Sequence, residues 1–189
     1  MLNTIKAILF DLDGVIVDSA PFHFKSWKRF MSKHKIKFLK NDFKHTFGMT
    51  NKQILKKYIS QNLTEEDIVK MSDEKEEIYR EVAKGKIKPI KGAVDFIKVS
   101  RERFKIALVS STPRQNIDFV LSEFSLHNFF DCIISSSDIT KGKPDPECFI
   151  LASCKLQVDI KYCAVIEDSQ HGIDAAKSAG CPVCIGILT

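Results

Sequence analysis

Short apolar runs recur along the chain and are separated by longer amphipathic segments. The runs that predict buried strands lie at residues 5–10, 106–109, 132–134, 163–166 and 183–188. Each run is only a few residues long, which suits a strand better than a helix. Because segments of helical length separate most of these runs, the pattern favours parallel strands joined by helices.

The segments between the later runs carry helix signals. The apolar positions that repeat at the spacing of one helix face are Ile117, Val120, Leu121 and Phe124. Pro146 suits the start of a helix, and Ser169 can cap another that ends at Gly180. The sequence therefore predicts an α/β fold, with a Rossmann-like parallel sheet core and helices on both faces.

Residues 18–90 interrupt this alternation. They lack strong strand signals, and their charged segments predict helices at 19–33, 51–61 and 65–83. A helical domain inserted after the first strand is the simplest organisation. We therefore expect an α/β core formed by 1–17 and 91–189 and a helical domain at 18–90, with a return linker at 84–92.

The composition is that of an ordinary folded protein. The 189 residues are 44% apolar and 28% charged, as is usual for globular chains. No run approaches the roughly 20 apolar residues of a membrane span, and the N-terminus has no secretory signal. We expect a cytoplasmic protein without a membrane partner.

The net charge of +5 is unevenly distributed. Segment 18–90 holds 17 lysines and arginines against 10 acidic residues, and the rest of the chain holds 12 against 14. A basic segment can attract nucleic acid or phosphorylated small molecules. Its lysines are scattered, and no zinc-finger or helix-turn-helix spacing accompanies them. We expect a solvated helical surface and no nucleic-acid partner.

Six cysteines lie in or beside apolar segments: Cys132, Cys148, Cys154, Cys163, Cys181 and Cys184. Without a secretory signal they predict reduced thiols that behave as small core residues. Cys181 and Cys184 also have the spacing of a metal or redox pair. They lack a second pair, and positions three apart in a strand face opposite sides, which favours the core interpretation.

Polar side chains follow the apolar runs, at the strand ends where parallel sheets bind ligands. They are Asp11 and Asp13, with Gly14 beside them, after the first run, Ser110, Ser111 and Thr112 after the second, Lys143 after the third, and Glu167, Asp168 and Ser169 after the fourth. Each piece alone could be a turn, a helix cap or a surface loop. Their joint order predicts that four distant segments converge on one crevice.

This set of side chains suits phosphate chemistry. Clustered carboxylates resist ionisation unless a cation joins them, and Mg²⁺ prefers oxygen ligands. A lysine and hydroxyl groups can hold phosphoryl oxygens, and a carboxylate can be a covalent nucleophile. On a continuing strand Asp11 and Asp13 would point the same way. One could then attack phosphorus while the other transfers a proton.

In these motifs the chain resembles the haloacid dehalogenase superfamily of phosphotransferases. The stretches that resemble the four family motifs are Asp11-Leu-Asp13-Gly14-Val15, Val109-Ser110-Ser111, Lys143-Pro144-Asp145-Pro146 and Glu167-Asp168-Ser169. They occur in the family's order, and the resemblance runs from about Lys6 to Gly186. The presence of Asp13 argues against the true dehalogenases, which lack that second aspartate.

The resemblance implies a role for each residue. Asp11 would be the nucleophile that becomes phosphorylated, and Asp13 the general acid and base. The phosphate-binding residues would be Ser110, Ser111 and Lys143. The Mg²⁺ ligands would be Asp11, Asp168 and the backbone carbonyl of Asp13, with Glu167 bound directly or through water. The Lys143–Pro144 peptide bond would be cis, as it often is in the family.

Residues 18–90 resemble the small helical cap of β-phosphoglucomutase and its phosphatase relatives. Such caps close over the site and select the substrate. His23 and Trp27 share one helix face. By resemblance His23 couples cap closure to the acid/base aspartate, although both residues also suit packing between domains. Asn51 replaces an arginine that binds the distal phosphate in the mutase pattern, and the candidate substitutes are Lys52 beside it and Arg80 later in the cap.

The resemblance predicts an Mg²⁺-dependent phosphomonoester hydrolase that acts on a small phosphorylated metabolite, such as a sugar phosphate, through an aspartyl phosphate. The alternative is a phosphosugar mutase of the β-phosphoglucomutase type, in which a sugar hydroxyl instead of water takes the phosphoryl group from Asp11. A non-catalytic binding protein on the same fold is a second alternative, which the intact Asp11, Asp13 and Lys143 disfavour. We expect a monomer.

Overall fold

The computed structural model describes residues 4–46 and 49–188. The chain divides into two compact units, one formed by Met1–Asp18 with Lys88–Thr189 and the other by Ser19–Ile87. The second unit starts one residue later and ends three residues earlier than the helical domain expected at 18–90.

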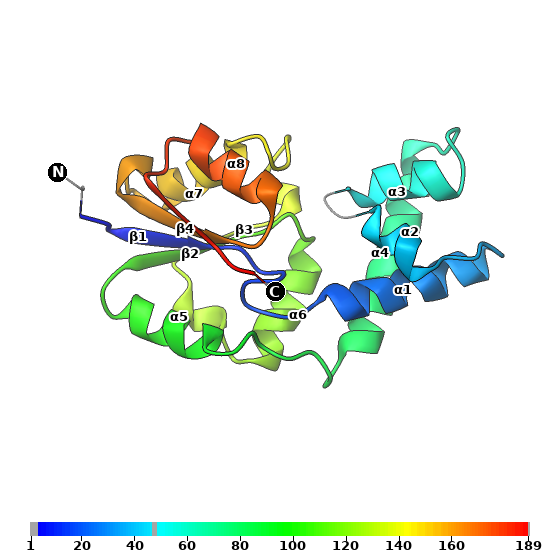
Figure 1. Cartoon of the computed structure of the whole chain (residues 1–189), viewed down its shortest axis with the longest axis horizontal. Helices are drawn as coiled ribbons and strands as arrows, with labels where there is room; N and C mark the ends of the chain where they lie inside the picture. Colours follow the sequence, from blue (N-terminus) through cyan, green and yellow to red (C-terminus); the bar gives the residue numbers. More distant parts are fainter. Residues whose placement is uncertain (1–3, 47–48, 189) are drawn as a thin grey trace. The chain divides into compact units, whose positions relative to one another are not determined.

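The first unit is built on a five-stranded parallel sheet (Figure 1). Its strands, in spatial order, are β3 (Cys132–Ile134), β2 (Lys105–Val109), β1 (Ala7–Phe10), β4 (Cys163–Glu167) and β5 (Val183–Gly186). The chain moves outward from β1 on one side through β2 and on the other through β4. Such a reversal of strand order is where parallel α/β sheets bind ligands. Phe10, the last residue of β1, is in register with Leu108 and Ile166.

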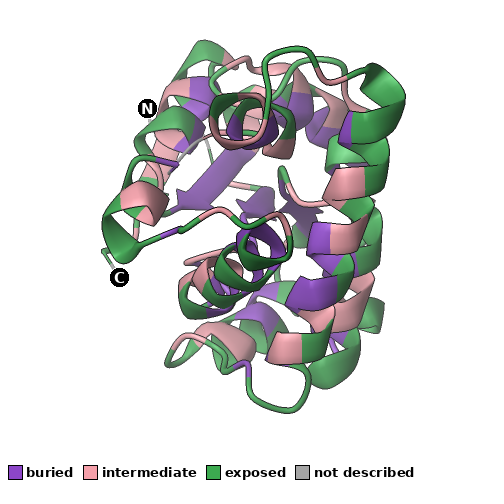
Figure 2. Ribbon diagram, turned by 90° about the vertical axis from the view of Figure 1, so that its right-hand side faces the viewer, coloured by how far each residue is buried: buried purple, intermediate pink, exposed green. Residues whose placement is uncertain are grey.

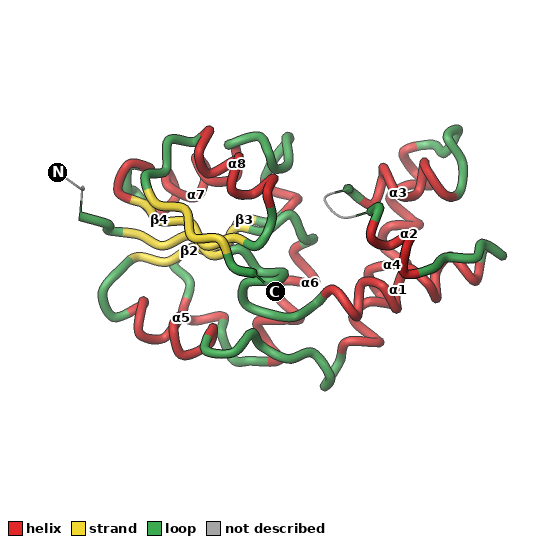
Figure 3. Tube along the Cα trace, in the orientation of Figure 1, coloured by secondary structure: helices red, strands yellow, loops and turns green. Residues whose placement is uncertain are grey.

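Helices cover both faces of this sheet. They are α5 (Ala93–Arg101), α6 (Arg114–Glu123), α7 (Glu147–Leu156) and α8 (Gln170–Ser178). Helices α7 and α8 lie on one face, and α5 and α6 lie on the other (Figure 3). Short 3₁₀ helices span His127–Phe129, Ser136–Asp138 and Ile160–Tyr162. The α/β fold that the sequence predicts is confirmed.

The central strands are buried because their sequences are continuously apolar. Every residue of β1 and β4 is buried (purple in Figure 2), as expected for central parallel strands covered on both faces. The core between the sheet and α7 includes Leu9, Val109 and Phe149. Burying such side chains contributes roughly 1.5–3 kcal/mol each. This packing fixes the strand ends that carry the polar residues.

All the regular secondary structure described in the second unit is helical. Its helices are α1 (Ala20–Lys33), α2 (Lys40–Lys44), α3 (Asn51–Tyr58) and α4 (Glu65–Ala83). Thr50 and Thr64 cap α3 and α4 by accepting hydrogen bonds from backbone N–H groups of the first turn. The buried core of this unit includes Trp27, Phe30 and Leu55.

The apolar pattern locates most of these elements well. The bounds predicted for β3 and α4 are those observed, and the other strands shift by a few residues. Ser169 caps α8, and Gly180 follows that helix with a φ of 86°. Helices α2 and α5 were not predicted. Helix α5 leaves Phe96 and Val99 exposed, so its apolar residues do not fall on one face.

The cysteines are all free. Cys148, Cys163 and Cys181 are buried, whereas Cys154 is exposed and does not behave as a core residue. Burial raises the pKa of the Cys163 thiol to about 12 and those of Cys148 and Cys181 to about 11. The buried thiols are therefore neutral. Among the helices described, none combines the length and the apolar character needed to cross a membrane.

Candidate active site

Three neighbouring strands deliver polar residues to one edge of the sheet. The N–H of Asp11 donates to the Ile166 carbonyl at 3.0 Å, which extends the ladder between β1 and β4 by one residue. Beyond β2, the N–H of Ser110 donates to the Ile134 carbonyl at 3.0 Å. These backbone bonds hold Asp11 and Ser110 as rigidly as the strands that precede them.

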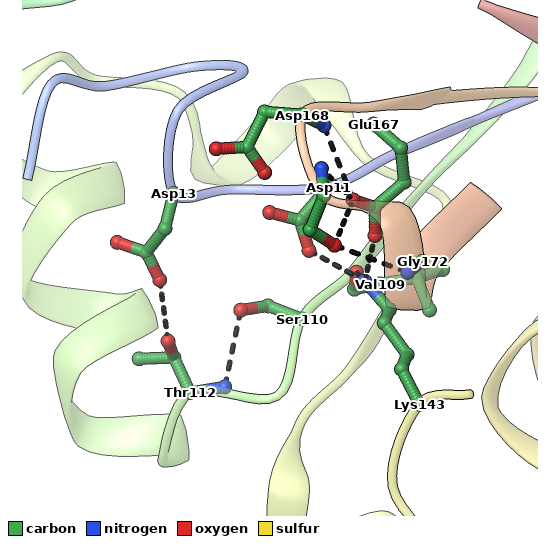
Figure 4. A network of polar contacts seen from close by, with 10 residues as sticks. Asp11, Asp13, Val109, Ser110, Thr112, Lys143, Glu167, Asp168 and Gly172 are labelled. Carbon is green, nitrogen blue, oxygen red and sulfur yellow. Dashed lines mark hydrogen bonds and ion pairs between the residues drawn. The ribbon is translucent and has the colours of Figure 1, made fainter. Parts of the chain in front are cut away.

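Lys143 joins all three of these strand ends (Figure 4). Its Nζ donates to Asp11 Oδ1 at 2.6 Å, to the Val109 carbonyl at 3.1 Å, and to Glu167 Oε1. The ammonium also lies 5.2 Å from the centre of the Phe149 ring. The Lys143–Pro144 peptide bond that precedes α7 is cis, as the resemblance implies. Lys143 is thus fixed by three oxygens and one aromatic face.

Burial and charge act together on this cluster. Burial, together with the carboxylates of Glu167 and Asp13, raises the pKa of Asp11 to about 8, although Lys143 acts in the opposite direction. Burial opposes the charge on Lys143, but Asp11 and Glu167 outweigh it and hold the pKa of Lys143 above its usual value. A single cation is therefore shared by two buried carboxylates.

Asp168 adds a third carboxylate to this group. One oxygen from each of Asp11, Glu167 and Asp168 lies within 4.8 Å of the others. Burial and the charges of Glu167 and Asp13 raise the pKa of Asp168 to about 6. Because crowded carboxylates ionise together only when a cation compensates them, this donor set fits a hard divalent ion such as Mg²⁺.

Glu167 also organises the start of α8. Its Oε2 accepts hydrogen bonds from the N–H of Asp168 at 3.1 Å, the N–H of Ser169 at 3.2 Å and the Ser169 hydroxyl at 2.9 Å. The Ser169 hydroxyl in turn accepts from the N–H of Gly172 at 3.0 Å. One carboxylate therefore ties Lys143 to the first turn of a helix.

Two glycines leave space for these carboxylates. A Cβ on Gly172 would lie 1.9 Å from the carboxyl carbon of Glu167, and a Cβ on Gly14 would lie 1.9 Å from Asp168 Oδ2. Gly14 also has a φ of 75°, which few other residues adopt. Sequence reasoning missed Gly172, because its signal is only a small residue in the first turn of a helix.

Replacing Gly172 by alanine is expected to lower stability by about 1–3 kcal/mol, because the methyl group displaces the Glu167 carboxylate. At a helix position with open space around the glycine, the same change would raise stability by about 1 kcal/mol. The sign of the stability change therefore shows whether the added methyl group meets the Glu167 carboxylate. Denaturant unfolding measures the difference. Gly142→Ala is the matched control, because a Cβ there meets nothing within 4 Å. Equal stability of the two variants would contradict the close approach.

Asp13 lies apart from the Lys143 cluster. Strand β1 ends at Phe10, and the chain then turns, with the N–H of Gly14 donating to the Val17 carbonyl at 2.8 Å. The continuing strand that would align Asp11 with Asp13 is therefore absent from this segment. Asp13 Oδ2 instead accepts a hydrogen bond of 2.6 Å from the Thr112 hydroxyl (Figure 4).

The hydroxyl residues after β2 differ in their surroundings. Ser110 is buried, and its Oγ accepts from the N–H of Thr112 at 3.1 Å. Ser111 is exposed. The sequence places Thr112 with Ser110 and Ser111 after the second apolar run, but only Ser110 and Ser111 were expected to bind phosphate. The alternation of a short strand gives no hint that the third residue after it reaches back to the loop after β1.

The second unit contains a buried polar cluster of its own. Lys75 Nζ lies 3.0 Å from His23 Nδ1 and 2.9 Å from Glu76 Oε1. The amide of Asn51 donates to Glu76 Oε1 at 2.7 Å. The Lys75 ammonium also lies 5.1 Å from the centre of the Trp27 ring. Three of the four candidate cap residues therefore surround one buried ion pair.

Lys52, the fourth candidate, lies elsewhere. Its ammonium pairs with Glu65 at 2.6 Å on the surface, where about half of the Lys52 side chain is exposed. Sequence reasoning missed Lys75, which stands in a run of charged residues typical of a solvated helix face. A signal was present, because Lys75 precedes the buried Ile78 and Tyr79 at helical spacing.

Comparison with known proteins agrees with this geometry. The sequence profile of haloacid dehalogenase-like hydrolases matches residues 8–185. The chain is 29% identical over 187 residues to the phosphorylated carbohydrates phosphatase of Thermotoga maritima, covering 97% of this chain and 85% of that protein. It is 31% identical over 184 residues to β-phosphoglucomutase of Bacillus subtilis, covering 93% and 80%.

A solved structure is similar as well. A family IA, variant 3 hydrolase of the haloacid dehalogenase type from Entamoeba histolytica superposes with a TM-score of 0.89 at 31% identity, covering 97% of this chain and 84% of that one. The profile match spans nearly the whole α/β unit and the inserted helices. The chain therefore belongs to the haloacid dehalogenase-like hydrolases and is a hydrolase or phosphotransferase of that superfamily.

Proposed function

We propose that the protein is an Mg²⁺-dependent phosphomonoester hydrolase that acts on a small sugar phosphate. The observation that carries the proposal is the buried contact between Asp11 and Lys143 at the end of the central strand. A fixed carboxylate beside a fixed ammonium suits nucleophilic attack on a phosphoryl group whose charge must be neutralised. The name of the Thermotoga maritima relative supports sugar phosphates as the substrate class.

In the proposed reaction, Asp11 attacks phosphorus and the bond to the leaving alcohol breaks. Asp13 donates a proton to the leaving oxygen, so the alcohol departs neutral. Asp13 then removes a proton from the water that attacks the phosphoryl group on Asp11. Inorganic phosphate and free Asp11 result. Lys143, with Ser110 and Ser111, binds phosphoryl oxygens during both transfers.

The metal ligands in this proposal are the carboxylates of Asp11 and Asp168 and the backbone carbonyl of Asp13, with Glu167 bound directly or through water. Bound Mg²⁺ would supply neutralisation of the charge on the phosphoryl oxygens. The crowding of three carboxylate oxygens within 4.8 Å supports this assignment.

We propose that residues 19–87 act as a cap that selects the substrate. The candidate substrate residues are His23, Trp27, Asn51 and Lys52. The contact of His23 with the buried Lys75 ammonium supports a polar cap site. Free cysteines support action in the reducing cytoplasm.

A phosphosugar mutase is the second candidate, and the 31% identity to the Bacillus subtilis enzyme favours it. A mutase has to hold a second phosphate. The amide of Asn51 is neutral and already bonded to Glu76, which favours the hydrolase. The two activities differ in the acceptor that takes the phosphoryl group from Asp11.

Phosphorus NMR separates these activities. The protein is mixed with Mg²⁺ and a panel of sugar phosphates that includes β-glucose 1-phosphate with a trace of the 1,6-bisphosphate. We expect inorganic phosphate to accumulate, and chelation by EDTA to stop it. Accumulation of glucose 6-phosphate instead would establish the mutase. Neither product from any member of the panel would overturn the proposed function.

A further inference from the structure

Thr112 is held from three directions at the end of β2. Its hydroxyl donates to Asp13 Oδ2 at 2.6 Å, its N–H donates to Ser110 Oγ at 3.1 Å, and its carbonyl accepts from the N–H of Ser136 at 3.2 Å. Pro113 follows it and restricts its backbone to extended conformations. Thr112 is therefore a rigid donor, although it belongs to a loop.

The hydroxyl bonds to a residue that is 99 positions away in sequence. Asp13 lies in the turn after β1, where no strand fixes its side chain. The Thr112 hydroxyl has one proton to donate, and it directs that proton to Oδ2 of the Asp13 carboxyl. That bond is compatible with both the protonated and the ionised form of Asp13. It can therefore keep the carboxyl in one orientation through both half-reactions.

We propose that Thr112 is a positioning residue that orients Asp13 for proton transfer, an inference that rests on the proposed function. It couples the acid/base residue to Ser110, because one residue binds both. Loss of the hydroxyl removes the hydrogen bond to Asp13 Oδ2 without removing any charge from the site.

The test compares two leaving groups in Thr112→Val and Thr112→Ser. The ratio kcat/KM reports the steps up to departure of the leaving group. A sugar alkoxide needs a proton from the enzyme in order to leave, whereas p-nitrophenolate leaves without one. We expect Thr112→Val to lower kcat/KM for fructose 1-phosphate about 10–100-fold, part of the usual contribution of general acid catalysis. For p-nitrophenyl phosphate we expect a loss below about 3-fold.

Thr112→Ser keeps the donor and is expected to retain wild-type kcat/KM for both esters. Thermal unfolding of each variant separates a folding defect from a catalytic one. Equal losses of Thr112→Val on both esters would overturn the inference, because they would assign Thr112 to phosphate binding or to folding. Unchanged hydrolysis of fructose 1-phosphate would overturn it too. A wild-type protein that hydrolyses neither p-nitrophenyl phosphate nor any sugar phosphate of the panel would overturn the proposed function, and this inference with it.

Discussion

Replacing Asp11 by asparagine is expected to abolish turnover of every phosphomonoester while the protein stays folded. The amide has the shape of the carboxyl group but is not a nucleophile, so we expect a loss of at least about 10⁴-fold in kcat, or more than about 5 kcal/mol of barrier. Its carbonyl oxygen still accepts the 2.6 Å hydrogen bond from Lys143 that Asp11 Oδ1 accepts. Steady-state phosphate release measures the loss.

The fold is expected to tolerate this change. Asp11 is one of three carboxylates whose oxygens lie within 4.8 Å of one another, so its removal lowers repulsion, and Lys143 keeps Glu167 as a partner. We expect the Tm of Asp11→Asn in EDTA to equal or exceed that of the wild type. Asp118→Asn is the matched control, since Asp118 pairs with Arg114 on the surface of α6. Residual turnover above about one per cent would assign the nucleophile to another group.

The sequence predicts the sheet well because its signal is local. A parallel strand covered on both faces is a short continuous apolar run, and β1 and β4 follow that rule at every buried position. The positions of Asp11 and Glu167 in the candidate site are predicted equally well, because both residues lie at the ends of such strands. Once the strands are parallel, their carboxyl ends share one edge, and the register of Phe10 with Ile166 follows.

What the sequence does not reveal are contacts made across long separations. Thr112 and Asp13 meet only because two loops turn toward each other, and no periodicity encodes that. Gly172 is required by the bulk of Glu167, five residues earlier, which only the packed structure reveals. In the second unit, Lys75 is buried against His23 although it stands in a charged run. Such residues follow from tertiary packing and not from propensity.

Lys143→Met is expected to damage both stability and activity. The variant keeps the side-chain volume but leaves Asp11 and Glu167, whose side chains are 9% and 1% exposed, without their shared cation. Removing one partner of a buried ion pair costs about 3–5 kcal/mol. We expect a loss of that size in EDTA by denaturant unfolding, and a fall in kcat of about 10²-fold or more with Mg²⁺, because a donor to the phosphoryl oxygens is absent.

The pH dependence of the stability loss in Lys143→Met identifies the cause of that loss. Lys143 lowers the pKa of Asp11, which burial holds above its unfolded value, so without Lys143 the folded-state pKa of Asp11 rises further. Stability that depends on such protonation is present at low pH and lost as pH rises. The loss of unfolding free energy in Lys143→Met, measured in EDTA, is therefore expected to be smaller at pH 5 than at pH 8.

Lys141→Met is the matched control, because 73% of the Lys141 side chain is exposed. Its stability should match that of the wild type at both pH values. A deficit that is independent of pH would indicate lost packing against Phe149 in place of uncompensated charge.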